Sequence, residues 1–250
     1  MSVGSSIKKL VFRYTGMENY LRLMQRGYFL AYQMGFLKSN PEYAYHYFIK
    51  SLISKNDVII DIGANLGYYS ILFAQWASEG KVYSVEPIGI YNRIFNEKAK
   101  RYPNITLYPY ALGTEEKNVE LVSSPQTGYL KTGLPHVYDP GRDGAIENQE
   151  FRFEVKMKIA SRLFGDLEKL NYIKCDIEGF EYIVLSDMKD IIARHKPKVQ
   201  VEIWPDHQKE LFDMFEELDY QPYKLIDNKL KLQDKENISI GGDFIFLPNK

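Results

Sequence analysis

Five acidic residues that each follow or end an apolar segment are the side chains of this chain best suited to chemistry: Asp61, Glu86, Asp176, Glu178 and Glu202. Short apolar runs are typical of buried strands in a parallel sheet, and such sheets bind their ligands outside the carboxyl ends of the strands. Carboxylates gathered at that edge suit a cationic ligand, the hydroxyls of a ribose or a divalent metal ion. We therefore expect a ligand site there.

The first apolar run, residues 58–60, leads into the turn DIGANLG at residues 61–67. This turn does not fit the dinucleotide pattern G-x-G-x-x-G, because Asn65 and Tyr68 stand where the second and third glycines belong. The second glycine lets the backbone approach a pyrophosphate, so Asn65 disfavours a dinucleotide. The chain also lacks the G-x-x-x-x-G-K-[ST] loop of triphosphate sites. The turn instead indicates an uncharged nucleoside.

Glu86 lies 25 residues after Asp61 and closes the second apolar run, over residues 81–86. A carboxylate in that place can accept hydrogen bonds from both hydroxyls of a ribose. With Asp61 and the glycine turn, it describes a site for an adenosine ligand without phosphates. S-adenosylmethionine fits this description, because carboxylates also stabilise its cationic sulfonium. It is the cofactor that we expect.

Four segments together resemble the FkbM-type methyltransferases: DVIIDIGANLGYYS at 57–70, VYSVEP at 82–87, YALG at 110–113 and YIKCDIEGFE at 172–181. The resemblance covers about residues 57–203. It implies an α/β, Rossmann-like S-adenosylmethionine-dependent methyltransferase fold with a mostly parallel seven-stranded sheet, six strands parallel and one antiparallel, and helices on both faces. It also implies O-methylation, frequently of sugars in surface polysaccharides or of natural products.

The expected cofactor-binding residues lie at the ends of the first three strands, except Asp176, which ends the strand predicted over 172–176. Asp61 orients the methionine end of the cofactor or the amides of the turn, and Glu86 binds the ribose. Asn65 either binds the cofactor carboxylate or caps the following helix. The complete set is Asp61, Gly63, Asn65, Gly67, Glu86, Pro87, Tyr110, Ala111, Leu112 and Asp176, where the two glycines let the backbone approach the ligand and residues 110–112 lie near the adenine or in the core.

Methyl transfer to a hydroxyl requires positioning of the two reactants and removal of one proton. Asp176 is the first candidate for the base, and Glu178 and Glu202 are the second. Two or three of these carboxylates could instead bind Mg²⁺ or Ca²⁺, so a metal-dependent enzyme stays open as an alternative.

The chain has four histidines, and histidine titrates in the range that a base needs. His136, in a long irregular segment, and His207, after the strand predicted over 198–203, are each a further candidate for the base. His46 and His195 are expected to be surface or packing residues.

Alternating apolar runs and helical patterns predict a doubly wound domain over residues 51–250. Its predicted strands are 58–60, 81–86, 105–110, 118–122, 151–159, 172–176, 198–203, 223–226 and 243–247. Its predicted helices include 67–77, 91–101, 161–170 and one from after residue 176 to about 195. Residues 123–150 show no periodicity and predict a long substrate loop. Residues 1–50 are rich in aromatic side chains and predict a helical cap, which could also mediate homo-oligomerisation.

Composition and charge restrict the kinds of partner that this protein is expected to bind. The net charge is −1, from 32 basic and 33 acidic residues, which disfavours a nucleic acid partner. No apolar run reaches the roughly 18 residues of a membrane span, and the N-terminus does not resemble a signal peptide, so we expect a cytoplasmic protein. The resemblance to the FkbM-type methyltransferases implies a sugar, nucleotide-sugar or glycan acceptor as the partner. The alternatives are a non-sugar natural product as acceptor, an NAD-binding oxidoreductase and a non-catalytic scaffold.

Overall fold

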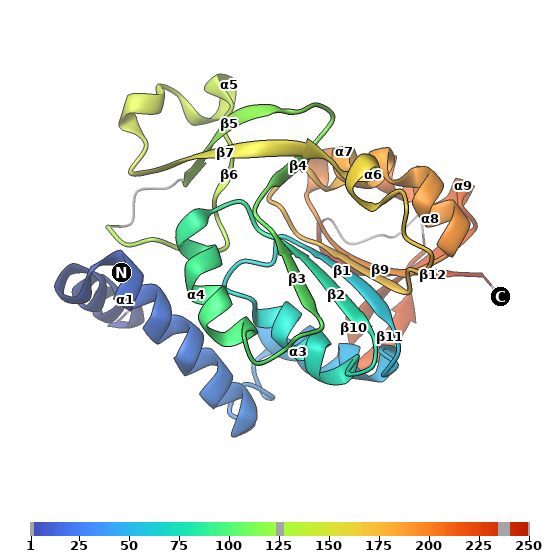
Figure 1. Ribbon diagram of the computed structural model, residues 1–250, viewed down its shortest axis with the longest axis horizontal. Helices are drawn as coiled ribbons and strands as arrows, with labels where there is room; N and C mark the ends of the chain where they lie inside the picture. Colours follow the sequence, from blue (N-terminus) through green and yellow to red (C-terminus); the bar gives the residue numbers. More distant parts are fainter. Residues whose placement is uncertain (1–2, 124–127, 235–240, 250) are drawn as a thin grey trace.

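A computed structural model describes residues 3–123, 128–234 and 241–249, and Figure 1 shows its elements. One eight-stranded sheet runs through the centre in the order β11-β10-β12-β9-β8-β1-β2-β3. Helices cover both of its faces, and a smaller second sheet lies above one end. The fold is α/β and mostly parallel, as the sequence predicts.

The central sheet contains the seven expected strands and one more. Six strands run parallel, and β12 (Gly242–Pro248) is antiparallel because it pairs antiparallel with both β9 and β10. The additional strand, β11 (Lys229–Leu232), pairs antiparallel with β10 at the edge and was not predicted. The six parallel strands are β1 (Val58–Ile62), β2 (Lys81–Val85), β3 (Ile105–Tyr108), β8 (Tyr172–Cys175), β9 (Lys198–Ile203) and β10 (Tyr220–Ile226).

Strand order reverses at β1, because β2 and β3 lie on one side of it and β8 and β9 on the other. Ligands of doubly wound sheets bind at such a reversal, outside the carboxyl ends of the strands. The strand register aligns four buried polar side chains across this region, Ser84, Asp61, Lys174 and Gln200. Burying polar side chains in a row inside a sheet costs free energy unless they form hydrogen bonds or ion pairs with one another. The row also places the charges of Asp61 and Lys174 next to the carboxyl ends of the strands.

The helices follow from their apolar faces. α3 (Tyr68–Trp76) and α4 (Gly89–Ala99) follow β1 and β2, and α9 (Gln208–Glu217) buries Leu211 and Phe215 against the sheet. The helix predicted over 161–170 is shorter: α6 (Ala160–Phe164) ends before Gly165. The long helix predicted before residue 195 is divided into α7 (Glu181–Asp187) and α8 (Lys189–His195).

A second, four-stranded sheet with the order β4-β7-β5-β6 was not predicted as a separate unit. The segment expected to be a structureless loop contributes β6, α5 and a 3-10 turn to this region, and residues 124–127 of it lie outside the described residues. β6 has only two residues, too few for any alternation of apolar and polar side chains to be visible in the sequence. Its elements are β4 (Ala111–Gly113), β5 (Lys117–Ser123), β6 (His136–Val137), α5 (Pro140–Asp143), a 3-10 turn (Ile146–Asn148) and β7 (Phe151–Ile159).

The N-terminal extension packs on the domain. α1 (Val3–Gln33) is kinked at Gly16, buries Leu21 and Phe29, and runs beside α4 (Figure 1). α2 (Ala44–Phe48) follows between the 3-10 turns Pro41–Tyr43 and Ile49–Leu52. Among the described residues, no helix has the length and apolar character needed to cross a bilayer.

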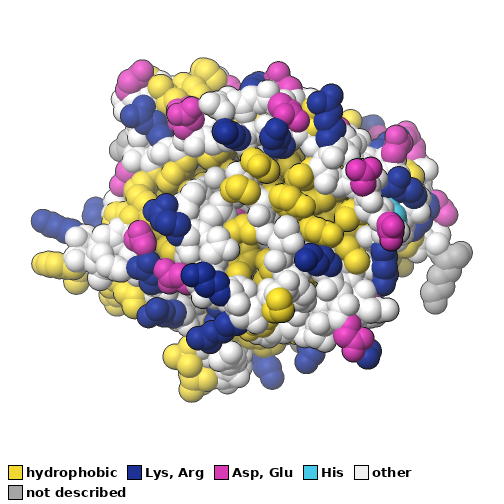
Figure 2. All heavy atoms as spheres, viewed as in Figure 1, with side chains coloured by type: hydrophobic (Ala, Val, Ile, Leu, Met, Phe, Trp, Pro, Cys, Tyr) yellow, Lys and Arg dark blue, Asp and Glu magenta, His cyan; other side chains and the backbone are white. Residues whose placement is uncertain are grey.

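The outer face of the extension leaves large apolar side chains uncovered. Figure 2 shows hydrophobic and basic side chains side by side along the left and lower edge, where α1 lies. The exposed apolar residues are Ile7, Leu10, Tyr14, Leu23, Leu30, Met34 and Phe36.

Candidate functional site

A pocket opens at the carboxyl ends of β1, β2 and β8. Its cavity volume is about 200 Å³, and it is partly open to solvent. Eleven of the residues expected from the sequence line it: Asp61, Gly63, Asn65, Glu86, Pro87, Tyr110, Ala111, Leu112, His136, Asp176 and Glu178. Gly67, Glu202 and His207 do not line it.

The amides of the turn after β1 are occupied inside the protein. Gly63 and Ala64 both donate to the carbonyl oxygen of Val85, at 3.0 and 2.9 Å. The amide of Asn65 donates to Glu86 Oε2 at 2.9 Å. A pyrophosphate needs free amides at this place, so the turn does not resemble a dinucleotide site.

Asn65 stabilises the turn rather than the helix that follows it. Its φ of 54° lies in the left-handed region, its Oδ1 accepts from the amide of Leu66 at 2.8 Å, and its Nδ2 donates to the carbonyl of Thr132 at 2.8 Å. Asn65 thereby ties the turn to the segment that leads into β6. The first residue before α3 is Gly67, where a side chain would overlap the ring of Phe95, so helix packing explains this glycine and ligand approach does not.

Glu86 is buried at the end of β2 with its carboxylate in the pocket. Oε1 accepts from the amide of Ile88 at 2.7 Å, and Oε2 accepts from Asn65. Burial raises the pKa of Glu86 to about 7, although the two amides oppose the shift. A carboxylate has about four lone-pair positions, so Glu86 can accept further hydrogen bonds from a ligand.

Asp61 is fully buried in the middle of the polar row. Its Oδ2 accepts from the hydroxyl of Ser70 at 2.5 Å, whereas its Oδ1 has no hydrogen-bond partner among the described residues. Burial raises the pKa of Asp61, and the nearby ammonium of Lys174 opposes that shift. Leaving a buried carboxylate oxygen without a hydrogen bond costs free energy, so a donor group on a ligand in the pocket would stabilise this atom.

Asp176 already has two partners. Lys174 Nζ donates to its Oδ2 at 2.9 Å, and the carboxyl group of Glu202 forms a hydrogen bond with it. Burial raises the pKa of Asp176, but the charge and hydrogen bond of Lys174, together with Glu202 and His46, lower it below its usual value. Burial and the charge of Asp176 raise the pKa of Glu202 to about 9. The two carboxyl groups thus shift in opposite directions.

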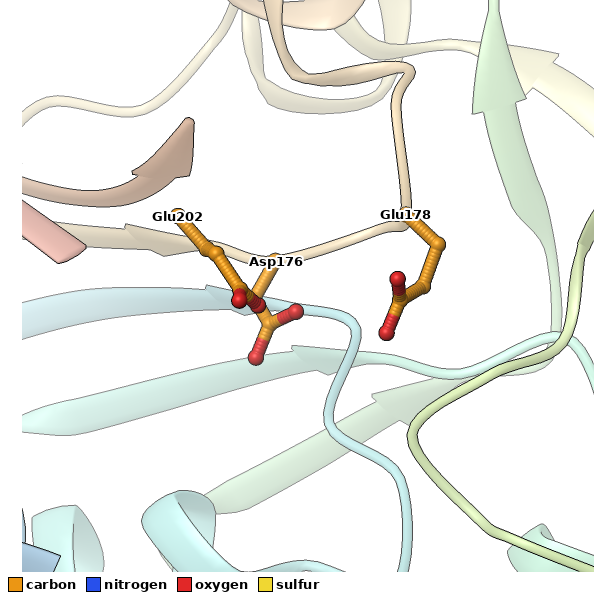
Figure 3. Close-up of side chains that lie close together, drawn as sticks. All are labelled: Asp176, Glu178 and Glu202. Atoms are coloured by element: carbon orange, nitrogen blue, oxygen red, sulfur yellow. The ribbon is translucent and has the colours of Figure 1, made fainter. Parts of the chain in front are cut away.

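Glu178 lies in the pocket wall on the loop after β8. Its φ of 57° is unusual for a residue with a side chain, and such strain is concentrated at functional sites. Burial, followed by the charges of Asp176 and Glu181, raises the pKa of Glu178 to about 8. Figure 3 shows the carboxyl groups of Asp176 and Glu202 next to each other and that of Glu178 on the same side. One oxygen of each lies within 4.8 Å of the others.

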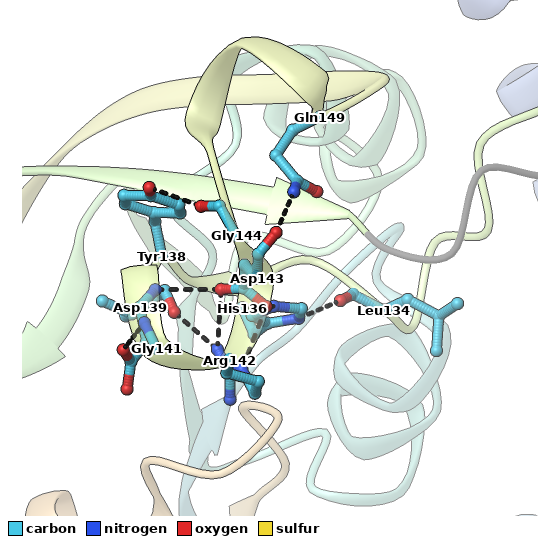
Figure 4. A network of polar contacts seen from close by, with 10 residues as sticks. Leu134, His136, Tyr138, Asp139, Gly141, Arg142, Asp143, Gly144 and Gln149 are labelled. Atoms are coloured by element: carbon cyan, nitrogen blue, oxygen red, sulfur yellow. Dashed lines mark hydrogen bonds and ion pairs between the residues drawn. The ribbon is translucent and has the colours of Figure 1, made fainter.

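The two histidines proposed as bases are poorly placed for that role. His136 lines the pocket, but its Nδ1 faces the carbonyl of Leu134 at 2.8 Å and its Nε2 faces Asp143 Oδ1 at 3.0 Å (Figure 4). Both partners are acceptors, so neither ring nitrogen offers a lone pair to the pocket. His207 stacks on Tyr182 with a centroid distance of 5.7 Å, away from the pocket lining.

The sequence analysis missed pocket residues that come from elsewhere in the chain. His46 of α2 lines the pocket, so its interpretation as a surface or packing residue was incomplete. Tyr91 of α4 also lines it, and its hydroxyl has no hydrogen-bond partner among the described residues. No local pattern marks either residue, because only the packing of their helices against the strand ends brings them to the site.

The doubly wound sheet, with its pocket at the strand reversal, places the chain in the class of Rossmann-like α/β proteins. Within that class, the chain belongs to the FkbM methyltransferases. The sequence model of the family, described as "Methyltransferase FkbM domain", matches residues 61–224. This match confirms the resemblance seen in the sequence.

A solved structure agrees with this fold. The chain is 17% identical to methyltransferase FkbM from Methylobacillus flagellatus KT, with a TM-score of 0.51 over 82% of this chain and 47% of that one. The chain thus spans about half the length of that protein. No curated protein matches the chain.

Two other structures align over more of their own length. A precorrin-6y C5,15-methyltransferase from Geobacter metallireducens GS-15 is 12% identical, with a TM-score of 0.47 over 85% of this chain and 90% of that one. A putative methyltransferase from Streptococcus mutans, in complex with SAH, is 13% identical, with a TM-score of 0.47 over 84% and 98%.

Proposed function

We propose that this protein is an S-adenosylmethionine-dependent O-methyltransferase whose acceptor is a hydroxyl of a sugar, a nucleotide-sugar or a surface glycan. The observation that carries the proposal is that two buried carboxylates, Asp61 and Glu86, line the same pocket at the strand reversal. The unpaired Oδ1 of Asp61 fits the ammonium of the methionine part of the cofactor. Membership of the FkbM family supports methyl transfer.

In this proposal, different pocket residues bind different parts of the cofactor. Glu86 binds the ribose hydroxyls, and Asp61 binds the amino group. The side chains of Pro87, Ala111 and Leu112 provide the apolar surface against which an adenine ring packs. Gly63 leaves room for the backbone carbonyl of Asp176, so that the turn after β1 and the loop after β8 lie against each other beside the ligand.

S-adenosylmethionine supplies an electrophilic methyl group on a sulfonium centre. The protein then has to place the acceptor hydroxyl in line and take its proton. We assign the proton to Glu178, because its carboxyl faces the pocket and its raised pKa makes it a stronger base than Asp176, which Lys174 holds ionised. The positive charge of the bound cofactor's sulfonium favours the ionised form of Glu178, and this is the form that accepts a proton.

The acceptor class rests on the family. Sugar hydroxyls suit a pocket rich in carboxylate acceptors, and a hydroxyl of a non-sugar natural product is the alternative. The oxidoreductase alternative is disfavoured by the occupied amides of the turn after β1, and the scaffold alternative by the unpaired oxygen of Asp61.

Calorimetric titration with S-adenosylmethionine, S-adenosylhomocysteine, NAD and NADP tests the cofactor. We expect micromolar binding of the first two and none of the dinucleotides. Transfer of a labelled methyl group to a panel of sugars and nucleotide-sugars then tests the acceptor. Binding of NAD without binding of either sulfur compound would overturn the proposal.

Two further expectations belong with this proposal. The exposed apolar side chains of α1, Ile7, Leu10 and Tyr14 among them, support self-association through the N-terminal extension. Analytical ultracentrifugation of the wild-type protein and of a variant with these three residues changed to Ser tests it. The cytoplasmic location stays a prediction of the sequence.

A further inference from the structure

His46 brings the N-terminal extension into the pocket. It lies on α2, outside the residues 61–224 that match the family, and its ring stacks on Tyr69 with a centroid distance of 4.0 Å and an interplanar angle of 24°. Tyr69 belongs to the first turn of α3, which also lines the pocket. The ring is therefore held in a fixed plane at the pocket wall.

One hydrogen bond determines which nitrogen of His46 carries the proton. The hydroxyl of Tyr28 lies 2.5 Å from Nδ1. Among the described residues, no other acceptor lies within hydrogen-bond distance of this half-buried hydroxyl. A buried phenol O–H without an acceptor is costly. Tyr28 therefore donates to Nδ1, and the proton of the neutral ring is on Nε2.

The ring is neutral at physiological pH. Burial lowers the pKa of His46 to about 3, and the ammonium of Lys174 adds to this effect while Asp176 opposes it. His46 is thus a hydrogen-bond donor through Nε2 and not a base, because its free nitrogen already carries a proton. Among the described residues, no protein atom accepts a hydrogen bond from Nε2.

Donors gather on this side of the pocket. The first amides of a helix have no acceptor within it and carry the positive end of the helix dipole, and the first turn of α3 is at Tyr68 and Tyr69. Lys174 Nζ lies 4.9 Å from the centre of the Tyr69 ring. Two carboxylates lie here as well, since Asp176 pairs with Lys174 at 2.9 Å and Asp61 is the neighbour of Lys174 on β1. Lys174 therefore already has an acceptor, whereas Nε2 of His46 has none among the described residues and is the donor left for an anionic group of a ligand.

We propose that Nε2 of His46 donates a hydrogen bond to the carboxylate of the methionine part of the cofactor, so that the N-terminal extension completes the cofactor site. This assignment rests on the proposed function. It gives Asp61 and His46 complementary tasks, since one binds the ammonium and the other the carboxylate of the same amino acid group.

The test compares two ligands that differ in that group. S-adenosylhomocysteine contains the amino acid, and 5′-methylthioadenosine has the same adenosine and sulfur without it. We expect H46F, which keeps a ring against Tyr69, to weaken S-adenosylhomocysteine roughly tenfold in calorimetry and to leave methylthioadenosine unchanged. E86Q is the matched control, because it should weaken both ligands. H46Q, whose amide can still donate, should retain more affinity for S-adenosylhomocysteine than H46F.

Each other outcome overturns the assignment. Equal losses for both ligands in H46F and H46Q would mean that His46 only shapes the pocket. Unchanged affinity for both would remove His46 from the cofactor site. Failure of the wild-type protein to bind either ligand would overturn the proposed function itself, and with it this assignment. Thermal denaturation of the two variants identifies any loss that comes from unfolding.

Discussion

The carbonyl oxygen of Asp176 lies so close to Gly63 that a Cβ atom at residue 63 would overlap it. The two residues follow β1 and β8, the strands that meet where the strand order reverses. The amide of Asp176 also donates to the carbonyl of Ile62 at 3.1 Å. This contact joins the turn that faces the ribose site to the acidic loop that contains Glu178, so both halves of the pocket depend on the missing side chain of Gly63.

G63A should therefore destabilise the protein and impair the pocket together. The φ of 81° is unfavourable for alanine, and the overlap with Asp176 forces one loop to move, so we expect the free energy of unfolding to fall by roughly 2–4 kcal/mol. Urea denaturation measures this loss. G35A is the matched control, since Gly35 has a φ of 78° but only ordinary contacts, with side-chain carbons of Lys38 at 3.7 Å, and it should cost about 1 kcal/mol. Equal losses in the two variants would contradict the role of the overlap.

The affinity for S-adenosylhomocysteine should depend on pH through Glu86. Ribose hydroxyls donate to the ionised carboxylate, whose pKa burial raises to about 7 in the free protein. Binding should be constant well above pH 7 and weaken by up to about tenfold per pH unit below it, because the proton must leave before the ligand binds. E86Q should weaken binding roughly tenfold at pH 8 and remove this dependence. Calorimetry between pH 5.5 and 8.5 is the measurement, and an unchanged pH profile in E86Q would exclude the ribose role.

Turnover should depend on a second carboxyl group, that of Glu178. Its pKa of about 8 means that the ionised form increases as the pH rises, so kcat should rise toward alkaline pH and then level off. E178Q should lower kcat roughly 100- to 1000-fold, with less than about a tenfold change in the affinity for S-adenosylmethionine. E202Q is the matched control, because it makes the same Glu-to-Gln change at a residue beside the pocket. This variant should keep the wild-type pH profile of kcat. If E202Q abolished the profile and E178Q kept it, Glu202 would be the base.

Chelation should leave activity unchanged. Oxygens of three carboxyl groups lie within 4.8 Å of one another, but Asp176 is paired with Lys174 and the pKa of Glu202 is raised. A metal ion would have to displace Lys174 and compete with protons for these carboxyl groups. Methyl transfer measured with and without EDTA, and calorimetry with Mg²⁺ and Ca²⁺, test this expectation. Loss of activity with EDTA that Mg²⁺ restores would favour the metal-dependent alternative.

Local patterns in the sequence account for the parts of the site that lie on the parallel strands. Asp61 and Glu86 follow short apolar runs, and the carboxyl ends of parallel strands necessarily meet at one edge of the sheet. The pocket therefore contains both, as the sequence predicts, although no ligand role of either residue has been tested. The strands β1, β2, β8 and β9 are confirmed to within two residues for the same reason.

Features that depend on distant contacts were not visible in the sequence. β6 and β11 are short edge strands, and pairing with a neighbour defines them rather than any periodicity of their own. Gly67 has the sequence environment of a ligand-binding glycine, yet it makes room for Phe95, 28 residues further along the chain.

The sequence by itself determined the family, the sheet and the carboxylates at the strand ends, because these follow from local runs of residue types. Only the tertiary structure decided in which direction the pKa of each carboxyl group shifts. Lys174 keeps Asp176 ionised, burial leaves Glu178 and Glu202 with raised pKa values, and the extension places His46 against Tyr69. Protonation depends on burial and on charges a few ångströms away in space, and neither quantity is encoded by neighbours along the chain.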